Sequence, residues 1–195
     1  NKFNKFFRMV KKRTCVFLSG KETNLKNLIS YSRDKSFPIK ISLIICNNNK
    51  AEGIKYAKWH NIPLILVNTK NKNSDNKILL QLKNYRISFI CLAGYMKIIS
   101  NKIIKEFRDK IINIHPSLLP KFKGLNTFSR VLKNKEIKSG CTVHYVNDKL
   151  DTGHIIKSKK FFLIPSDNET TLKHKTQNLE YKAFPQAIIS IFRHR

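Results

Sequence analysis

The sequence has few acidic residues, few glycines and prolines, and no long apolar run. Only 12 Asp and Glu residues stand against 39 Lys and Arg residues, and the 195 positions include six glycines and six prolines. No segment approaches the roughly 20 apolar residues that a membrane-spanning helix requires. No Pro/Gly/Ser-rich linker and no internal repeat interrupts the chain. We therefore expect one domain with no membrane partner, and neither a repeat protein nor a chain of linked modules.

Cysteine is also scarce and carries no recognisable pattern. The four cysteines, Cys15, Cys46, Cys91 and Cys141, are widely spaced, without a C-x-x-C pair. This spacing indicates neither a disulfide framework nor a zinc site, and we expect no metal. Each cysteine lies in an apolar context, which is typical of a small buried hydrophobic residue. A reducing, cytoplasmic location fits this usage best.

The first 13 residues are basic and contain no acid and no apolar stretch of the kind found in secretory signals. We interpret residues 1–13 as an N-terminal extension and residues 14–195 as the single domain. A start of the protein at Met9 and a remnant of an organellar transit segment are both compatible with this extension.

The formal net charge of +27 allows three interpretations. A nucleic-acid or anionic-membrane surface is one of them. A field that steers a phosphorylated or polycarboxylate small molecule is another. Because the basic residues are mostly lysines scattered among many asparagines, a compositional bias from an AT-rich coding sequence is the interpretation that we favour, and we expect no nucleic-acid partner.

Strand-like and helix-like segments alternate along the chain, which predicts an α/β fold with a parallel sheet and helices on both faces. Leu25, Leu28 and Ile29 share one helix face, and we expect Ile54, Ala57 and Trp59 to contact the core. Ser166 and Glu169 have the spacing of a capping box at the start of the last helix. The predicted strands are 14–20, 39–47, 62–68, 87–95, 111–115, 141–146 and 155–164, and the predicted helices are 24–34, 50–61, 75–85, 100–110, 127–135 and 165–192.

The turn "SGKETN" (19–24) follows the first predicted strand, where backbone N–H groups at a helix start can hold a phosphate. It is not a Walker A loop, because Cys15 stands where that loop needs glycine and Glu22 where it needs Ser or Thr. The G-x-G-x-x-G dinucleotide fingerprint is absent as well. A plain helix start with Ser19 and Glu22 as a capping box is the alternative.

Asn113 and His115 end the apolar strand "IINIH" (111–115). Residues i and i+2 of a strand point to the same side, so both side chains should project into the crevice where parallel sheets bind ligands. An amide donor beside an imidazole can stabilise negative charge on an oxygen and supply a proton. Local caps around the proline turn that follows are the structural alternative.

Asp151 in "LDTGH" (150–154) supplies a carboxylate to this pair. A carboxylate close to His115 would raise the pKa of the imidazole and set its tautomer. A turn-capping role for Asp151 remains the alternative. His144 alternates with apolar residues in "CTVHYV" and either faces this site or fills space.

These stretches together resemble the folate-dependent phosphoribosylglycinamide formyltransferase family. The matching pieces run in family order from about residue 14 to 190: "FLSGKETNLKNLI", "LAGYMKIIS", "NIHPSLLPKFKGLNT", "GCTVHYV", "LDTGHII" and "TQNLEYKAFP". The resemblance implies a Rossmann-like formyltransferase fold and transfer of a formyl group from 10-formyltetrahydrofolate, as co-substrate, to the amine of glycinamide ribonucleotide in purine biosynthesis. It leaves open a monomer or a homodimer.

The resemblance also implies roles for particular residues. It matches Asn113, His115 and Asp151 to the catalytic trio. It matches Gly20, Thr23, Asn24 and Glu180 to the binding of the ribonucleotide and its phosphate. The segment Met96, Lys97, Ile98 and Ile99 and the loop residues Asn147, Asp148, Leu150 and Asp151 match the folate site.

One departure from the family concerns Glu22, which stands in the phosphate turn where the family usually has glycine. A carboxylate there is unfavourable beside a phosphate unless it points away, and Lys21 is placed to offset it. The alternatives within the same chemistry are a methionyl-tRNA formyltransferase and a formyltetrahydrofolate hydrolase. The alternative from another class is a basic nucleic-acid-binding module, which would account for the charge of +27 but would leave Asn113, His115 and Asp151 without a role. Such a module typically interleaves aromatic and basic residues on one element, and we expect no such element in this chain.

Overall fold

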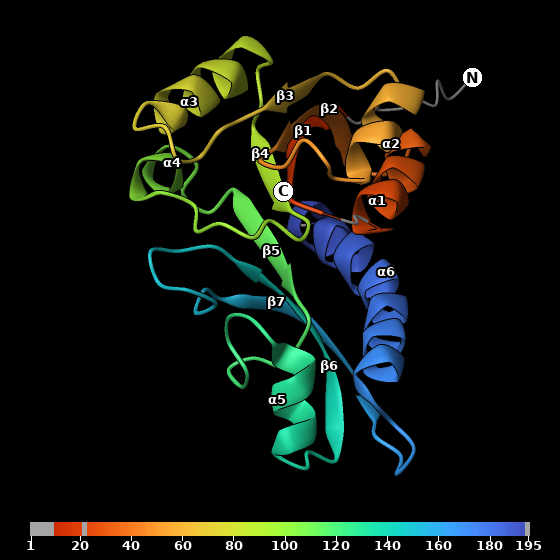
Figure 1. The fold of residues 1–195 in the computed structure, drawn as a ribbon. Helices are drawn as coiled ribbons and strands as arrows, with labels where there is room; N and C mark the ends of the chain where they lie inside the picture. Colours follow the sequence, from red (N-terminus) through yellow and green to blue (C-terminus); the bar gives the residue numbers. More distant parts are fainter. Residues whose placement is uncertain (1–9, 21–22, 194–195) are drawn as a thin grey trace, which may run out of the picture.

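The computed structural model describes residues 10–20 and 23–193, which form a layered α/β arrangement (Figure 1). Within these described residues, seven strands make one sheet in the order β3-β2-β1-β4-β5-β6-β7. The five strands from β3 to β5 are parallel, whereas β5, β6 and β7 pair antiparallel. The strands are β1 Lys12–Leu18, β2 Ile39–Cys46, β3 Leu64–Leu66, β4 Phe89–Leu92, β5 Ile111–His115, β6 Lys138–Tyr145 and β7 Ile155–Phe162.

The helices cover both faces of this sheet, as the alternation of segments predicts. One apolar core joins the sheet to α1, α2 and α6, and a second core joins the opposite face to α3 and α4. Leu25, Leu28 and Ile29 all lie in the first core, which confirms the face predicted for that helix. The helices are α1 Thr23–Arg33, α2 Gly53–Trp59, α3 Ser74–Asn84, α4 Asn101–Glu106, α5 Thr127–Lys133 and α6 Glu169–Arg193.

The order and type of the predicted elements are confirmed, and most bounds differ by a few residues. Strand β1 begins at Lys12, two residues before the predicted start of the domain, and residues 1–9 of the predicted extension lie outside the described residues. All four cysteines are buried and free, as predicted. Within residues 10–20 and 23–193, no helix is long and apolar enough to cross a membrane.

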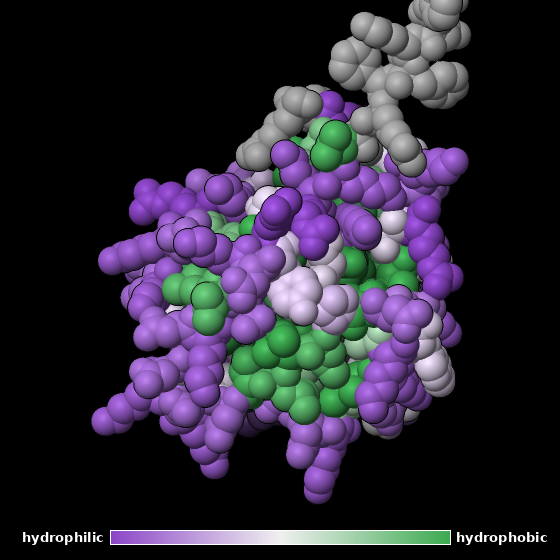
Figure 2. Space-filling model, turned by 90° about the horizontal axis from the view of Figure 1, so that it is seen from above, coloured by the Kyte–Doolittle hydropathy of each residue, from purple (hydrophilic) through white to green (hydrophobic). Residues whose placement is uncertain are grey.

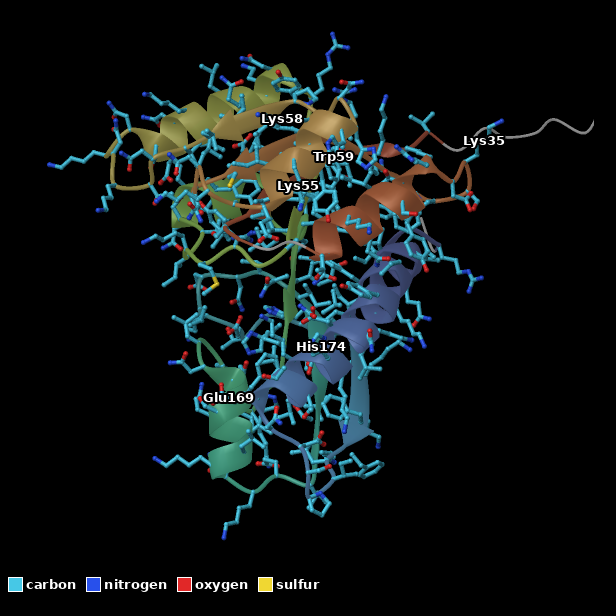
Figure 3. All side chains as sticks on the ribbon, turned by 45° about the vertical axis from the view of Figure 1, so that its right-hand side comes forward. Lys35, Lys55, Lys58, Trp59, Glu169 and His174 are labelled. Carbon is cyan, nitrogen blue, oxygen red and sulfur yellow. The ribbon has the colours of Figure 1, made fainter. Side chains whose placement is uncertain are left out.

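The predicted core position of Trp59 is wrong, because its side chain is 67% exposed. Ala57 faces the core from α2, and a residue two positions later on a helix points almost to the opposite side. Tyr56 packs edge-on against the Trp59 ring, and Lys55 Nζ lies 5.8 Å from the ring centroid. Figure 3 shows Lys55, Lys58 and Trp59 together on α2. Aromatic and basic residues therefore do alternate on one helix, contrary to our expectation.

Basic side chains are distributed over many elements. Exposed lysines include Lys12 on β1, Lys26 on α1, Lys55 on α2 and Lys157 on β7. On the face shown in Figure 2, hydrophilic residues surround an apolar area near its centre. This distribution agrees with a compositional origin for the net charge of +27.

Helix α6 begins with a different cap from the predicted Ser166 and Glu169 box. Asn168 Oδ1 accepts hydrogen bonds from the backbone N–H groups of Thr170 and Thr171, at 2.9 and 3.1 Å. Thr171 Oγ1 accepts in return from the Asn168 N–H at 2.9 Å. Asn168 is therefore the N-cap, since its oxygen satisfies two donors that have no partner within the helix.

Helix α6 also contains Pro185, which lacks the N–H that would bond the carbonyl of Tyr181 four residues earlier. Asn27 of α1 takes that place, because its Nδ2 donates to the Tyr181 oxygen at 2.8 Å. The carbonyl that Pro185 leaves without a helical donor thus accepts a hydrogen bond that joins α1 to α6.

Candidate active site at the carboxyl ends of the strands

Strand β5 brings Asn113 and His115 to one side of the sheet. Ile112 and Ile114 alternate with them and enter the core on the side of α1 and α6. Asn113 and His115 therefore point to the other side, as predicted from their spacing. Asn113 is half-buried and His115 is buried at the carboxyl end of the strand.

Asp151 meets His115 at this end of the sheet, which confirms that the two approach each other. Asp151 Oδ2 lies 3.4 Å from His115 Nδ1 and accepts a hydrogen bond from the Gly124 N–H at 2.8 Å. The backbone of Asp151 is left-handed, with φ 50°. Gly153 allows this turn to lie against β6, because a Cβ there would come within 1.6 Å of the Tyr145 carbonyl oxygen.

His144 is the functional candidate that the sequence left open, and it faces the site. It is the cross-strand partner of Asn113 on β6 and is only 2% exposed. Its Nε2 lies 3.3 Å from Asn113 Nδ2 and 3.5 Å from Asp151 Oδ1. The alternation along "CTVHYV" was a signal for a strand, but only the antiparallel pairing of β5 with β6 places His144 beside Asn113.

Backbone carbonyls define the tautomers of the two histidines. His115 Nε2 lies 2.9 Å from the Phe122 oxygen, and His144 Nδ1 lies 2.8 Å from the Tyr145 oxygen. A carbonyl oxygen only accepts, so each of these ring nitrogens carries a hydrogen. The other nitrogen of each ring, Nδ1 of His115 and Nε2 of His144, therefore faces the Asp151 carboxylate.

Burial dominates the titration of His115. Desolvation lowers the pKa of His115 below its usual value, against the Phe122 carbonyl and Asp151, which both raise it. His144 and Arg130 lower it further. We expected Asp151 to raise the pKa of His115; that interaction has the expected sign, but the cost of burying an imidazolium exceeds it.

Asp151 remains a carboxylate near neutral pH. Burial raises the pKa of Asp151, but its contact with His144, the hydrogen bond from the Gly124 N–H and the charge of the two imidazoles when they are protonated lower it below its usual value. The site thus combines a buried carboxylate, two imidazoles and an amide, a set that can orient donors and move a proton. In the described part of the chain, no group of His, Cys, Asp or Glu side chains is arranged to hold a metal ion.

Asn24 and Glu180, two of the predicted ribonucleotide contacts, also meet. Asn24 Nδ2 donates to Glu180 Oε2 at 2.9 Å, and both residues are buried. Burial raises the pKa of Glu180 to about 7, against the Asn24 hydrogen bond, which lowers it. Thr23 opens α1 next to Asn24, and Gly20 lies just before it, whereas Glu22 lies outside the described residues.

The predicted folate segments follow β4 and β6, the strands that lie on either side of β5 in the sheet. Ser19 Oγ accepts from the Met96 N–H at 2.8 Å, which ties the segment after β4 to the end of β1. Asn147 Oδ1 accepts from the Lys149 N–H and the Thr152 hydroxyl within the loop after β6. Figures 1 and 3 both show this loop beside the segment between β4 and α4.

Side chains in these two segments differ in their exposure to solvent. Met96, Ile98 and Leu150 are exposed by 60%, 79% and 54%, so they offer apolar surface to a ligand. Ile99 is instead buried in the core formed with α3 and α4. Lys97 and Asp148 are exposed at the surface of their segments.

Comparison with known proteins agrees with this geometry. A family model described as "Formyl transferase" matches residues 12–188, so the chain belongs to the formyl transferase family. The chain is 37% identical over 181 residues to the phosphoribosylglycinamide formyltransferase of Haemophilus influenzae, with 91% of this chain and 85% of that protein covered. Within the family, the phosphoribosylglycinamide formyltransferases are the branch that it resembles, as the sequence predicts.

Larger proteins and solved structures match as well. The chain is 40% identical over 184 residues to the trifunctional purine biosynthetic protein adenosine-3 of Drosophila pseudoobscura, covering 91% of this chain but only 14% of that protein. The crystal structure of phosphoribosylglycinamide formyltransferase from Bacillus halodurans superposes with a TM-score of 0.88 at 31% identity, covering 92% of this chain and 95% of that one. The Rossmann-like formyltransferase fold expected from the sequence is thereby confirmed.

Proposed function

We propose that this chain transfers the formyl group of 10-formyltetrahydrofolate to the primary amine of glycinamide ribonucleotide, a step of purine biosynthesis. The observation that supports it most is the meeting of Asn113, His115 and Asp151 at one end of β5 in a chain of the formyl transferase family. The bacterial relative and the matching structures bear the name of the enzyme that carries out this reaction.

In the proposed reaction the amine nitrogen attacks the formyl carbon, and negative charge develops on the formyl oxygen. One amide hydrogen of Asn113 points to His144, which leaves the second hydrogen for that oxygen. The Nε2–H group of His115 is the other donor. When substrate binds, its hydrogen bond to the Phe122 carbonyl is replaced by one to the formyl oxygen. Losing one such donor typically costs about 10² to 10³ in rate.

The same step needs a route for a proton. The attacking amine loses a proton, and N10 of the folate takes one up as the bond from carbon to N10 breaks. Asp151, ionised and held by the Gly124 N–H, is the acceptor on this route and also orients His115. Acid–base help of this kind contributes roughly 10² to 10⁴ in rate. The residues themselves supply these roles, so the proposal includes no metal.

The substrates are assigned to the two sides of the catalytic groups. Gly20 and Thr23 at the start of α1 would hold the phosphate, with Asn24 and Glu180 contacting the ribonucleotide. The exposed Met96 and Ile98, with Lys97, the backbone of Ile99 and the loop residues Asn147, Asp148 and Leu150, would take the folate. We keep a cytoplasmic location and a monomer or homodimer as predictions.

The test is to mix the purified protein with 10-formyltetrahydrofolate and to follow deformylation with and without glycinamide ribonucleotide. Turnover that requires the ribonucleotide and yields formylated product is the expected result. Turnover that ignores the ribonucleotide would instead indicate a hydrolase. Formylation of methionyl-tRNA in a parallel reaction would indicate the tRNA enzyme.

A further inference from the structure

His144 contacts two groups that have different roles in the proposed reaction. Its Nε2 lies within 3.3 Å of the Asn113 amide nitrogen, a donor to the formyl oxygen, and within 3.5 Å of Asp151 Oδ1, the proton acceptor. The imidazole of His144, on β6, is 2% exposed and lies between strand β5 and the turn at 150–153. Its two contacts in the site are with these groups, so its influence on the proposed reaction passes through them.

The partner of His144 Nε2 depends on whether the ring is protonated. The Nδ1 hydrogen is donated to the Tyr145 carbonyl at 2.8 Å in either case. When the ring is neutral, Nε2 is an acceptor and holds an Asn113 amide hydrogen. When the ring is protonated, the Nε2 hydrogen points to a carboxylate oxygen of Asp151, and the Asn113 amide loses its acceptor.

We propose that His144 is a positioning residue of this active site, which orients the Asn113 amide when neutral and the Asp151 carboxylate when protonated. The inference rests on the proposed formyl transfer. A proton that reaches the cluster of His115, His144 and Asp151 during the reaction thus changes how the oxygen donor is held.

The surroundings of Asp151 support this role. Its two oxygens have separate partners, since Oδ2 faces His115 and the Gly124 N–H while Oδ1 faces His144. In its protonated form, His144 lowers the pKa of Asp151 by donating a hydrogen bond and lowers the pKa of His115 by charge repulsion. Arg130 of α5 is the other charged group that acts on His115. Removing His144 should therefore raise the pKa of both groups.

Two substitutions separate positioning from packing. In His144→Asn, the amide keeps a donor for the Tyr145 carbonyl but leaves nothing at the position of Nε2. In His144→Gln, the longer amide reaches towards Asn113 and Asp151 and offers both a donor and an acceptor. His154→Asn is the matched control, because His154 lies three residues from Asp151 with an exposed side chain.

For His144→Asn we expect kcat to fall about 10- to 100-fold while KM for both substrates stays within about threefold, because misplaced catalytic groups cost rate rather than binding. The acid limb of kcat against pH should move to higher pH, since Asp151 must be ionised. His144→Gln should recover at least about threefold in kcat, and His154→Asn should stay within about twofold. Equal activity of His144→Asn and the wild type, or an unmoved acid limb, overturns the inference.

A measurement independent of turnover keeps the inference separate from the proposed function. In ¹⁵N NMR of the full chain, the His115 signals of the wild type and His144→Gln should titrate at different pH, and Asp151→Asn should shift the His144 Nε2 signal. If the wild type transfers no formyl group, these spectra still test the coupling. A His144 Nε2 signal that Asp151→Asn leaves unchanged overturns it whether or not the enzyme is active.

Discussion

Asn24 of α1 donates a hydrogen bond to Glu180 of α6 at 2.9 Å, and together with the bond from Asn27 to the Tyr181 carbonyl it joins these two helices. The side chains of Asn24 and Glu180 are both buried, and Asn24 Oδ1 has no hydrogen-bond partner among the described residues. A buried carboxyl that is held by a single donor is costly to ionise. This site is therefore sensitive to pH in a range where most carboxylates are not.

Glu180 should make stability fall as pH rises from about 4.5 to about 7. The pKa of Glu180 is about 7 in the folded protein against 4.5 for the free side chain, so the folded state binds more protons in this window. Glu180→Gln removes this dependence. Urea unfolding at pH 5 and pH 8 should show the variant gaining stability relative to the wild type by up to about 3 kcal/mol at the higher pH. Glu136→Gln, at a surface ion pair with Lys121, is the control; an identical pH dependence of wild type and Glu180→Gln would contradict the prediction.

We predict that Asn27 contributes to the stability of the fold because Pro185 leaves the Tyr181 carbonyl without its helical donor. Asn27→Ala leaves the Tyr181 carbonyl without its donor and should cost about 1–2 kcal/mol, or a few degrees in Tm. In a Pro185→Ala background the backbone N–H at position 185 can bond Tyr181, so the same substitution should cost clearly less. A double-mutant cycle by denaturant unfolding measures this coupling. Additive costs would show that Asn27 does not replace the missing helical hydrogen bond.

Asp151→Asn should lower kcat by about 10² to 10⁴, because the amide cannot accept the proton from the attacking amine. Asp109→Asn is a matched control, since Asp109 is exposed and also has a left-handed backbone, with φ 56°. Steady-state rates of ribonucleotide formylation compare the two variants. A rate for Asp151→Asn within a few-fold of the Asp109→Asn rate would remove Asp151 from the proton route.

Gly153→Ala should lower both stability and kcat. The added Cβ would lie 1.6 Å from the Tyr145 carbonyl oxygen, so the turn that carries Asp151 must move away from β6. Such overpacking typically costs about 1–3 kcal/mol, and the displaced carboxylate would lose its distances of 3.4 Å to His115 and 3.5 Å to His144. Thermal unfolding and turnover of the folded variant measure the two effects. Normal turnover in a destabilised variant would indicate that the turn relaxes without moving Asp151.

Local patterns in the sequence predicted much of the fold. Periods of two and of about 3.6 residues identified every strand and helix, since these repeats follow from backbone geometry. They failed at Trp59, which was placed on the core face of α2 but is exposed. They also failed at the start of α6, where Asn168 is the N-cap in place of the predicted Ser166. Both errors concern which of several nearby residues the packed structure selects.

Asn113 and His115 were found from the sequence because their common direction depends only on the alternation of a strand. The distances of Asp151 and His144 from them depend on how β5, β6 and the turn at 150–153 pack, and no local pattern contains that information. The net lowering of the His115 pKa likewise follows from burial by neighbours that are distant in sequence. The sequence by itself therefore determined the elements and the chemical groups at their ends. Only the tertiary structure decided their partners and their charge, because long-range packing controls both contact and desolvation.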